Sequence, residues 1–382
     1  MKTKHLIILL AASFLFVGAS VTAFAKDKAK VTDASDSKIT YIGRVLKEGP
    51  NVSFDWSGVQ CRLRFNGTGI SLRCSDTKAN YYNVWIDKET GCAPDLVIRT
   101  AGKDTTIVLA EKLGKGIHNL TLLKRTEGEQ GKTTFHSFET TGELLQADPV
   151  RKRLIEFVGD SYTCGYGTEN SVKDDPFKPE TENCNLTYAA IASRYFDADC
   201  ILVCHSGRGI ARNYDDWGKG RAKTTMPEKY EYVFDEAEGP LCEKPEQTPD
   251  LVVVYLGAND FSCGRQPSME LFCQNYHLLL NKIKARYGKE TPVLCLAAMQ
   301  DNGIYVYVRE ACLRSGLEGI WCVGVHRGIY NEDSDLGASM HPNHVGQKKM
   351  AFNIIPYIST ITGWGESLFP RLREALQPCL PR

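Results

Sequence analysis

The sequence predicts an α/β protein in two parts, a β-sandwich followed by a domain built on a mainly parallel sheet. Two patterns indicate this fold class. Between residues 38 and 147, short runs alternate apolar and polar side chains and are interrupted by glycine, as antiparallel strands are. From residue 148 onward, continuous apolar runs alternate with helical stretches, which is the order of a doubly wound parallel sheet. We therefore expect a jelly-roll-like sandwich over 38–147 and an α/β domain over 148–382.

The length and the charge of the chain limit its class. A chain of 382 residues with 42% hydrophobic side chains suits two domains of about 150 residues each. Its 46 Lys and Arg residues balance 46 Asp and Glu residues. Nucleic acid or an anionic membrane surface attracts a net basic face, so we expect neither as the main partner. After the N-terminal stretch, no run of about 18 uncharged apolar residues indicates a membrane-spanning helix.

The first 25 residues have the pattern of a cleaved secretory signal. Lys2 and Lys4 form a basic start, and residues 6–17 form an apolar run too short to span a bilayer comfortably. Ala23 and Ala25 supply small residues at the two positions that a signal peptidase reads. We expect a signal peptide over 1–25, cleavage after Ala25 and a secreted or periplasmic product without stable membrane insertion. An uncleaved anchor is the alternative.

The predicted sandwich follows a polar, flexible segment over 26–37. Its strands have side-chain period two and are separated by turn residues such as Gly58 and Asn66-Gly67. About 110 residues of such short strands are typical of a β-sandwich. The predicted strands are 52–56, 61–65, 70–74, 82–86, 105–109, 118–123 and 134–138.

The predicted parallel sheet begins after Ala147-Asp148-Pro149. The run 251–256, with sequence LVVVYL, is the strongest buried strand of the chain. In such a sheet, ligands bind in the loops at the carboxyl ends of the strands. The other predicted strands are 154–158, 200–204, 293–298 and 320–325, and the helices are 187–195, 268–287, 305–316 and 344–362.

The cysteine and histidine patterns do not predict a metal site or a disulfide framework. The 14 cysteines are scattered, without a CxxC motif, and several lie in apolar runs where a free thiol packs as a small hydrophobe. One or two disulfides are compatible with this pattern, but no pairing follows from it. His341 and His344 are separated by a proline, and spacing places no third ligand near them. We expect no metal and no cofactor.

Residues that could take part in catalysis follow three of the predicted strands and precede the last predicted helix. A glycine-rich turn after a buried strand can expose a serine hydroxyl at the sheet edge. The motifs GxxxxGK[ST] and GxGxxG are absent, so a phosphate loop is disfavoured, and so is the GxSxG elbow. The four blocks are Gly159-Asp160-Ser161, Ser206-Gly207, Gly257-Ala258-Asn259-Asp260 and His341-Pro342-Asn343.

Serine, glycine, asparagine and histidine in this order resemble the SGNH (GDSL-type) hydrolases, over about residues 151–362. The resemblance implies a flavodoxin-like hydrolase domain with Ser161 as the nucleophile and His341 as its general base. It also implies an oxyanion hole made by the backbone N–H groups of Ser161 and Gly207 and the side-chain amide of Asn259. The chemistry agrees, because a serine hydroxyl needs an adjacent base and a tetrahedral intermediate needs preorganised donors.

The pattern departs from the family at the acid. These hydrolases usually carry an aspartate two or three residues before the histidine, where this chain has Ser339 and Ala338. Either Asp335 reaches back to orient His341, or a backbone carbonyl does so and the site is a Ser–His dyad, which we favour. Trp217 is a candidate sugar platform, because aromatic faces stack on pyranose rings, but packing in the core or in a lid is an equal alternative.

A sandwich joined to an SGNH domain resembles the family-2 carbohydrate esterases. The segments 54–58 (FDWSG), 159–167 (GDSYTCGYG) and 206–209 (SGRG) carry this resemblance. It implies a secreted serine esterase that removes O-acetyl groups from xylan, glucomannan or their oligosaccharides through an acetyl-enzyme. Some members lack the acid. A non-catalytic carbohydrate-binding protein and a lipase or thioesterase with longer-acyl preference are the alternatives. The polysaccharide, the sugar hydroxyl and the oligomeric state stay open.

Overall fold

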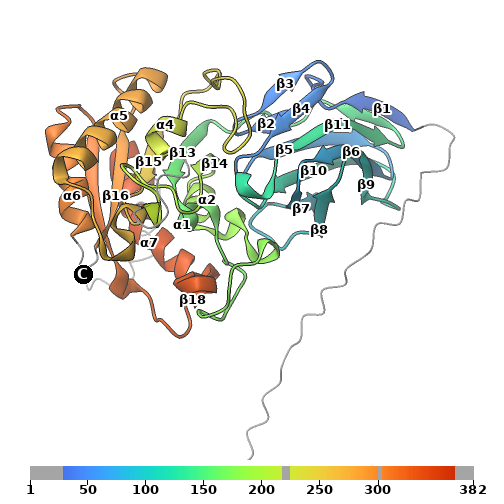
Figure 1. The fold of residues 1–382 in the computed structure, drawn as a ribbon. Helices are drawn as coiled ribbons and strands as arrows, with labels where there is room; N and C mark the ends of the chain where they lie inside the picture. Colours follow the sequence, from blue (N-terminus) through green and yellow to red (C-terminus); the bar gives the residue numbers. More distant parts are fainter. Residues whose placement is uncertain (1–28, 217–223, 300–302, 366–382) are drawn as a thin grey trace, which may run out of the picture.

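The structure is a computed structural model that describes residues 29–216, 224–299 and 303–365. The predicted signal peptide and Trp217 lie outside the described residues. In Figure 1 the chain forms two adjoining parts, an all-β part at the N-terminal end and an α/β part after it. Within the described chain, none of the helices combines the length and the apolar character that crossing a bilayer requires.

The all-β part, over the residues described, consists of two six-stranded antiparallel sheets. Its strands are β1 (Lys30–Asp33), β2 (Thr40–Ile42), β3 (Leu46–Glu48), β4 (Asn51–Phe54), β5 (Gln60–Asn66), β6 (Ile70–Asp76), β7 (Ala79–Ile86), β8 (Leu96–Ala101), β9 (Thr105–Ala110), β10 (Ile117–Lys124), β11 (Thr133–Thr140) and β12 (Glu143–Leu145). One sheet has the order β3-β4-β11-β6-β9, with β1 on β11, and the other has the order β12-β5-β10-β7-β8, with β2 on β5.

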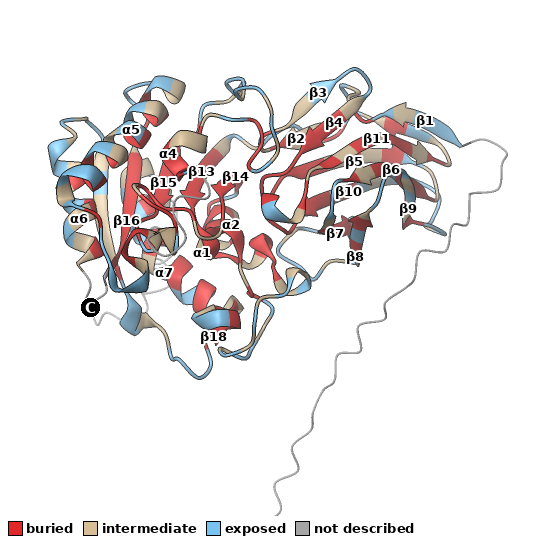
Figure 2. Ribbon diagram, viewed as in Figure 1, coloured by how far each residue is buried: buried red, intermediate tan, exposed pale blue. Residues whose placement is uncertain are grey.

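The two sheets pack face to face, because the side-chain alternation places aromatic residues on both inner surfaces. Tyr82 of β7 meets Phe54 and Phe135 of the other sheet, with ring centroids 6.4 and 5.8 Å apart. The Tyr82 hydroxyl donates a hydrogen bond to Thr133 Oγ1 over 2.7 Å, so its burial leaves no unpaired hydroxyl. Strands β5, β6 and β7 are largely buried, whereas the short strands β1 and β3 are mostly exposed (Figure 2).

The α/β part is built on one five-stranded parallel sheet of order β14-β13-β15-β16-β17. Helix α5 packs against α6, and α2 packs against α7 (Figure 1). The strands are β13 (Arg153–Gly159), β14 (Ala198–Cys204), β15 (Leu251–Tyr255), β16 (Val293–Met299) and β17 (Ile320–His326), with a small pair β18 (Leu336–Gly337) and β19 (His341–Pro342). The helices are α1 (Ser161–Cys164), α2 (Tyr188–Tyr195), α4 (Met226–Lys229), α5 (Met269–Tyr287), α6 (Ile304–Arg314) and α7 (His344–Thr362), and the 3₁₀ helices are η1 (Gly128–Gln130), η2 (Pro179–Thr181), η3 (Cys184–Leu186), η4 (Asn259–Gly264), η5 (Arg327–Ile329) and η6 (Ala338–Met340).

The register of the three central strands brings their carboxyl ends together. Gly159, at the end of β13, pairs with Cys204 of β14 and with Tyr255 of β15. The chain segments that follow these residues therefore leave the sheet at one edge, where ligands bind in open parallel sheets. The predicted fold class, a sandwich followed by a mainly parallel α/β domain, is confirmed.

The sandwich lies directly against the parallel sheet. A Cβ atom at Gly58, after β4, would come within 2.8 Å of Leu202 Cδ1 in β14, so glycine permits this approach. Arg44, between β2 and β3, reaches Glu156 in the middle of β13, and their side chains are 3% and 1% exposed. This buried ion pair couples the two parts, because a buried charge without its partner is strongly destabilising.

Candidate active site

Ser161 lies at the first turn after β13. Asp160 precedes helix α1, and its Oδ1 atom accepts a hydrogen bond from Tyr162 N over 3.2 Å. A Cβ atom at Gly159 would lie 2.0 Å from Thr163 Oγ1, so the sharp turn from strand to helix requires glycine there. This turn places the Ser161 hydroxyl at the carboxyl edge of the sheet.

His341 approaches Ser161 from the far end of the chain. Strand β19 pairs His341 with Gly337, and its Nε2 atom lies 2.8 Å from Ser161 Oγ. Its Nδ1 atom lies 3.0 Å from the carbonyl oxygen of Ser339. A carbonyl can only accept, so Nδ1 carries the proton and Nε2 is left with a free lone pair. The arrangement is that of a serine and a base ready to take its proton.

The turn before His341 is strained. Ser339 and Met340 have φ angles of 51° and 62°, in the left-handed region that non-glycine residues rarely adopt. Their N–H groups donate to the carbonyl oxygens of Asp175 and Lys173 over 2.9 and 2.8 Å. These two bonds hold the turn in the conformation that aims the Ser339 carbonyl at the imidazole ring.

The electrostatics of His341 keep it neutral. Burial lowers the pKa of His341 to about 4, although the carbonyl groups of Ser339 and Ala338 act in the opposite direction. At neutral pH the ring is therefore an unprotonated base. The structure does not bring Asp335 to this ring, because its carboxylate accepts hydrogen bonds from Asn331 N, Ser334 Oγ and Lys349 Nζ. Of the two alternatives for orienting His341, the contacts match the backbone carbonyl.

The turn after β14 and the start of η4 reach the same edge. Gly207 has a φ angle of +81°, which glycine tolerates. Among the described residues, no hydrogen bond occupies the backbone N–H of Gly207 or of Ser161. Asn259 donates both protons of its side-chain amide, to Arg208 O over 2.9 Å and to Asp160 Oδ2 over 3.2 Å. Burial raises the pKa of Asp160 to about 7. Because both amide protons of Asn259 already have acceptors, the amide must release one of them before it can bind an oxyanion.

Aromatic rings surround the base. Tyr166 stacks on His341 with ring centroids 4.2 Å apart and planes 30° apart, and Phe177 stacks on the other side of Tyr166 at 4.2 Å. Tyr162 meets the His341 ring edge to face at 5.4 Å. Sequence reasoning missed these rings. Tyr166 lies inside the Gly165-Tyr166-Gly167 stretch and carried a signal, whereas Phe177 lies in a loop without one.

Two clusters of potential metal ligands occur in the described residues: Glu127, Cys164 and Glu182, and His205, Asp235 and Glu236. In the second cluster, Arg208 already donates to both carboxylates. In the first, Glu182 Oε2 accepts the N–H of Glu127 and the Lys124 ammonium lies close by. Each cluster is balanced by neighbouring cations, so we assign neither a metal.

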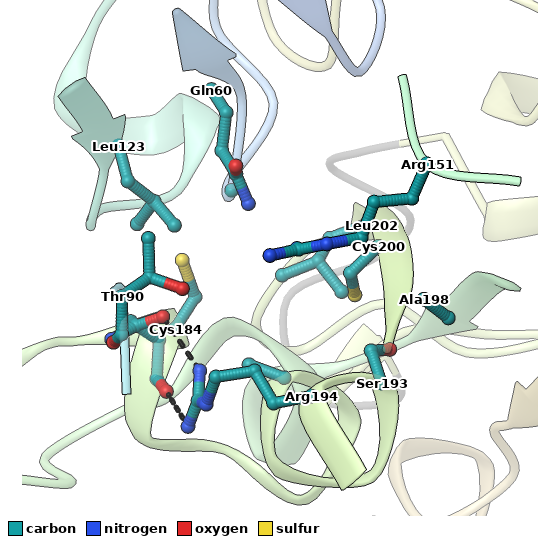
Figure 3. A pocket seen from close by; sticks show the side chains of 13 residues that line it. Gln60, Thr90, Leu123, Arg151, Cys184, Ser193, Arg194, Ala198, Cys200 and Leu202 are labelled. Carbon is teal, nitrogen blue, oxygen red and sulfur yellow. Dashed lines mark hydrogen bonds between the residues drawn. The ribbon is translucent and has the colours of Figure 1, made fainter. Parts of the chain in front are cut away.

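A cavity between the sandwich and the parallel sheet lies apart from these residues (Figure 3). Gln60, Arg151, Arg194 and Leu202 are among its lining residues, and Arg194 donates to Asn185, which also lines it. Its volume of about 20 Å³ has room for a water molecule and not for a sugar. None of the four predicted site residues lines it.

Comparison with known proteins places both parts of the chain in one family. Residues 41–149 match the model for the carbohydrate esterase 2 N-terminal region, and residues 157–349 match the model for the GDSL-like lipase/acylhydrolase family. An acetylxylan esterase / glucomannan deacetylase from Cellvibrio japonicus is 31% identical over 335 residues, which cover 80% of this chain and 90% of that one. The cellulase/esterase CelE of Acetivibrio thermocellus is 29% identical over 347 residues, or 88% of this chain, and the match spans 41% of CelE.

The solved structures agree with the sequence relatives. A family two carbohydrate esterase from Clostridium thermocellum, in complex with cellohexaose, has a TM-score of 0.77 and 29% identity, covering 85% of this chain and 99% of that one. Both parts of this chain therefore have counterparts of the same family in sequence and in structure. The chain belongs to carbohydrate esterase family 2, within the GDSL-like hydrolases.

Proposed function

We propose that the chain removes O-acetyl groups from plant cell-wall polysaccharide or its oligosaccharides, with Ser161 as nucleophile and His341 as general base. The chain is a carboxylic ester hydrolase by family. The observation that carries the proposal is the 2.8 Å contact of Ser161 Oγ with His341 Nε2. The Ser339 carbonyl fixes the proton on Nδ1, so the lone pair of Nε2 is free to accept the serine proton. Domains over 38–147 and 148–382 and export after cleavage at Ala25 are parts of the same proposal.

In the first half of the reaction, Ser161 Oγ attacks the acetyl carbonyl carbon while His341 Nε2 takes its proton. The carbonyl π electrons move to the oxygen, which the N–H groups of Ser161 and Gly207 stabilise, together with the Asn259 amide. When the intermediate collapses, the bond to the sugar oxygen breaks and the His341 imidazolium protonates that oxygen. The products are the free sugar hydroxyl and an acetyl group on Ser161.

In the second half, water replaces the sugar. His341 Nε2 takes a proton from the water, whose oxygen attacks the acetyl carbonyl, and the same donors bind the new oxyanion. Breakage of the bond to Ser161 Oγ releases acetate, and His341 returns the proton to the serine. His341 must be neutral at the start of each half, which its low pKa ensures at neutral pH.

The substrate class is supported by the relatives. Two curated relatives are named acetylxylan esterase / glucomannan deacetylase, and a solved relative binds cellohexaose. An acetylated plant polysaccharide is a substrate class that agrees both with the name of the two relatives and with the ligand of the third.

The test is acetate released from acetylated xylan and acetylated glucomannan by the purified chain, beside Ser161→Ala. We expect release that the substitution abolishes. A series of nitrophenyl esters with acyl chains from two to eight carbons separates this function from a lipase or thioesterase, which would prefer the longer chains. Glycan binding without release of acetate would favour the carbohydrate-binding alternative.

A further inference from the structure

The turn that carries Gly207 needs support from outside itself. This turn, residues 205–209, is called the oxyanion turn below. Inside it, Arg208 N donates to His205 O over 3.3 Å, a long bond. Gly207 adds conformational freedom, because it lacks a Cβ atom and has a φ angle of +81°. A donor for an oxyanion must nevertheless be fixed before the reaction begins.

A buried carboxylate of the sandwich holds this turn directly. Glu127, which follows β10 and is 1% exposed, accepts the backbone N–H of Ser206 on its Oε2 atom over 2.6 Å. The peptide group that it holds is immediately before the one that carries the Gly207 N–H. A carboxylate oxygen at this distance is a strong acceptor for a backbone N–H group.

Glu127 is itself fixed at both ends of its backbone. Its N–H donates to Glu182 Oε2 over 3.1 Å, and its carbonyl accepts from Lys124 Nζ over 3.1 Å. The same ammonium also donates to Thr126 O over 2.5 Å. The position of the carboxylate is therefore set by the sandwich, and the oxyanion turn takes its position from the carboxylate.

A second sandwich carboxylate supports the turn through one intermediary. Asp55, which follows β4, accepts the N–H groups of residues 235, 236 and 237 over 2.6, 2.9 and 3.1 Å. Asp235 in turn binds His205 Nδ1 over 2.7 Å and the Arg208 guanidinium. His205 precedes Gly207 and Arg208 follows it, so contacts on both sides of Gly207 connect the turn to the sandwich through Asp235 and Asp55.

We propose that Glu127 is a positioning residue of the esterase, through which the sandwich fixes the turn that carries the Gly207 N–H of the oxyanion hole. This inference rests on the proposed function, because it needs the Gly207 N–H to bind the oxyanion. The role acts on the transition state. Loss of Glu127 should therefore lower kcat and leave KM nearly unchanged.

The expected size follows from the geometry. Without Glu127 the Ser206 N–H loses its acceptor next to the peptide group that carries the Gly207 N–H, while Tyr214 N and the Asn259 amide still bind Gly207 O and Arg208 O. A misplacement of about 1 Å costs on the order of 10²-fold in rate, and loss of one oxyanion donor costs about 10²- to 10³-fold. We expect Glu127→Ala to lower kcat for p-nitrophenyl acetate by about 10²-fold. Glu127→Gln keeps an acceptor at the same reach and should recover most of this loss.

The decisive measurement compares two esters on the full chain. p-Nitrophenyl acetate develops an oxyanion, whereas p-nitrophenyl thionoacetate develops charge on sulfur, which is large and a weak acceptor. The kcat for the acetate divided by the kcat for the thionoacetate reports the oxyanion hole, because general damage to the site slows both esters. We expect this ratio to fall about tenfold or more in Glu127→Ala and to recover in Glu127→Gln. Arg44→Met is the matched control, because Arg44 also joins the two parts through a buried contact but does not touch the turn.

An unchanged ratio in folded Glu127→Ala, with both esters slowed equally or not at all, would overturn the proposal. So would an equal fall of the ratio in Arg44→Met. Should Glu127→Ala fail to fold, Glu127→Asp replaces it, since it keeps the charge but shortens the reach by one methylene, and the same fall is required of it. Ester hydrolysis that the wild type shows and Ser161→Ala abolishes tests the proposed function separately. A negative result for Glu127 therefore does not refute that function.

Discussion

Replacing Tyr166 tests the proposed role of His341 as a base that has no carboxylate beside it among the described residues. In the proposed reaction His341 becomes a cation when it takes the serine proton, and its described partners include the Ser339 carbonyl, the Tyr166 ring at 4.2 Å and the edge-to-face Tyr162 ring at 5.4 Å. A cation over an aromatic face is stabilised by about 0.5 kcal/mol at an exposed site and about 2 kcal/mol in a desolvated one. Those energies correspond to factors of about 2 and 30 in rate. His341 is partly buried, so we expect Tyr166→Leu to lower kcat/KM about tenfold.

The pH profile separates this effect from disorder of the site. The acid limb of kcat/KM reports the pKa of the free enzyme's base. Burial lowers the pKa of His341 to about 4, so wild-type activity should hold from neutral pH down to about 5 and fall as pH drops through 4. Removing the ring destabilises the charged form, which lowers this pKa further. The acid limb of Tyr166→Leu should therefore shift to lower pH, by up to about one unit.

The assay is p-nitrophenyl acetate hydrolysis between pH 3 and 8, with recovery of activity at pH 7 checked after each exposure. Tyr166→Phe is the matched control, because it keeps the ring over His341 and removes only the hydroxyl group. It should retain activity within about threefold of wild type, since the aromatic face that would stabilise the cation is unchanged. Equal losses in the Leu and Phe variants, or an acid limb that moves upward in Tyr166→Leu, would refute the stacking argument.

Three further outcomes follow from the contacts. Asp335→Asn should keep kcat/KM within about threefold, because the Asp335 carboxylate is held away from His341. A loss near 10⁴-fold would instead identify Asp335 as the acid of a catalytic triad. Arg44→Met should lower the free energy of unfolding by about 3 kcal/mol in urea denaturation, since it removes the cation beside the buried Glu156 carboxylate, which keeps the hydroxyl donors of Tyr230 and Tyr287, while kcat stays unchanged below the transition. Iodoacetamide at pH 7.5 should not inactivate the esterase through Cys164, because burial raises the pKa of this thiol far above the assay pH; rapid inactivation that a Cys164→Ala variant escapes would contradict this.

The parallel sheet was predictable because burial on both faces leaves a continuous apolar signature. The runs predicted over 154–158 and 251–256 correspond to β13 (Arg153–Gly159) and β15 (Leu251–Tyr255) within one or two residues. The sandwich was predicted less completely. The short strands β1, β2, β3 and β12 and the strand β8 (Leu96–Ala101) were not identified. The prediction of a flexible segment over 26–37 was wrong for β1 (Lys30–Asp33), which pairs with β11. Such strands owe their extended form to the neighbour that they pair with and not to their own alternation.

The site divides along a similar line. The blocks around Ser161, Gly207, Asn259 and His341 could be identified in the sequence because their order and their places at strand ends resemble the SGNH hydrolases. The contacts that tune them were not visible. Two consecutive left-handed residues, Ser339 and Met340, deliver the carbonyl to the base, and neither residue type signals that conformation. Glu127 meets Ser206 across 79 positions of chain, a separation at which one sequence offers no pairing information.

Among the described residues no carboxylate contacts His341, so in the proposed mechanism the catalytic demand shifts to the rest of the site. A carboxylate partner would raise the pKa of the base and stabilise the imidazolium, whereas a carbonyl does this more weakly. The result is a base that stays free of protons in mild acid but draws less strongly on the serine proton. The barrier must then be lowered elsewhere, by the ring of Tyr166 and by the donors to the oxyanion. Those donors act through distance and direction, so they gain most from rigid support. A glycine turn tied to buried carboxylates of a second domain provides such support.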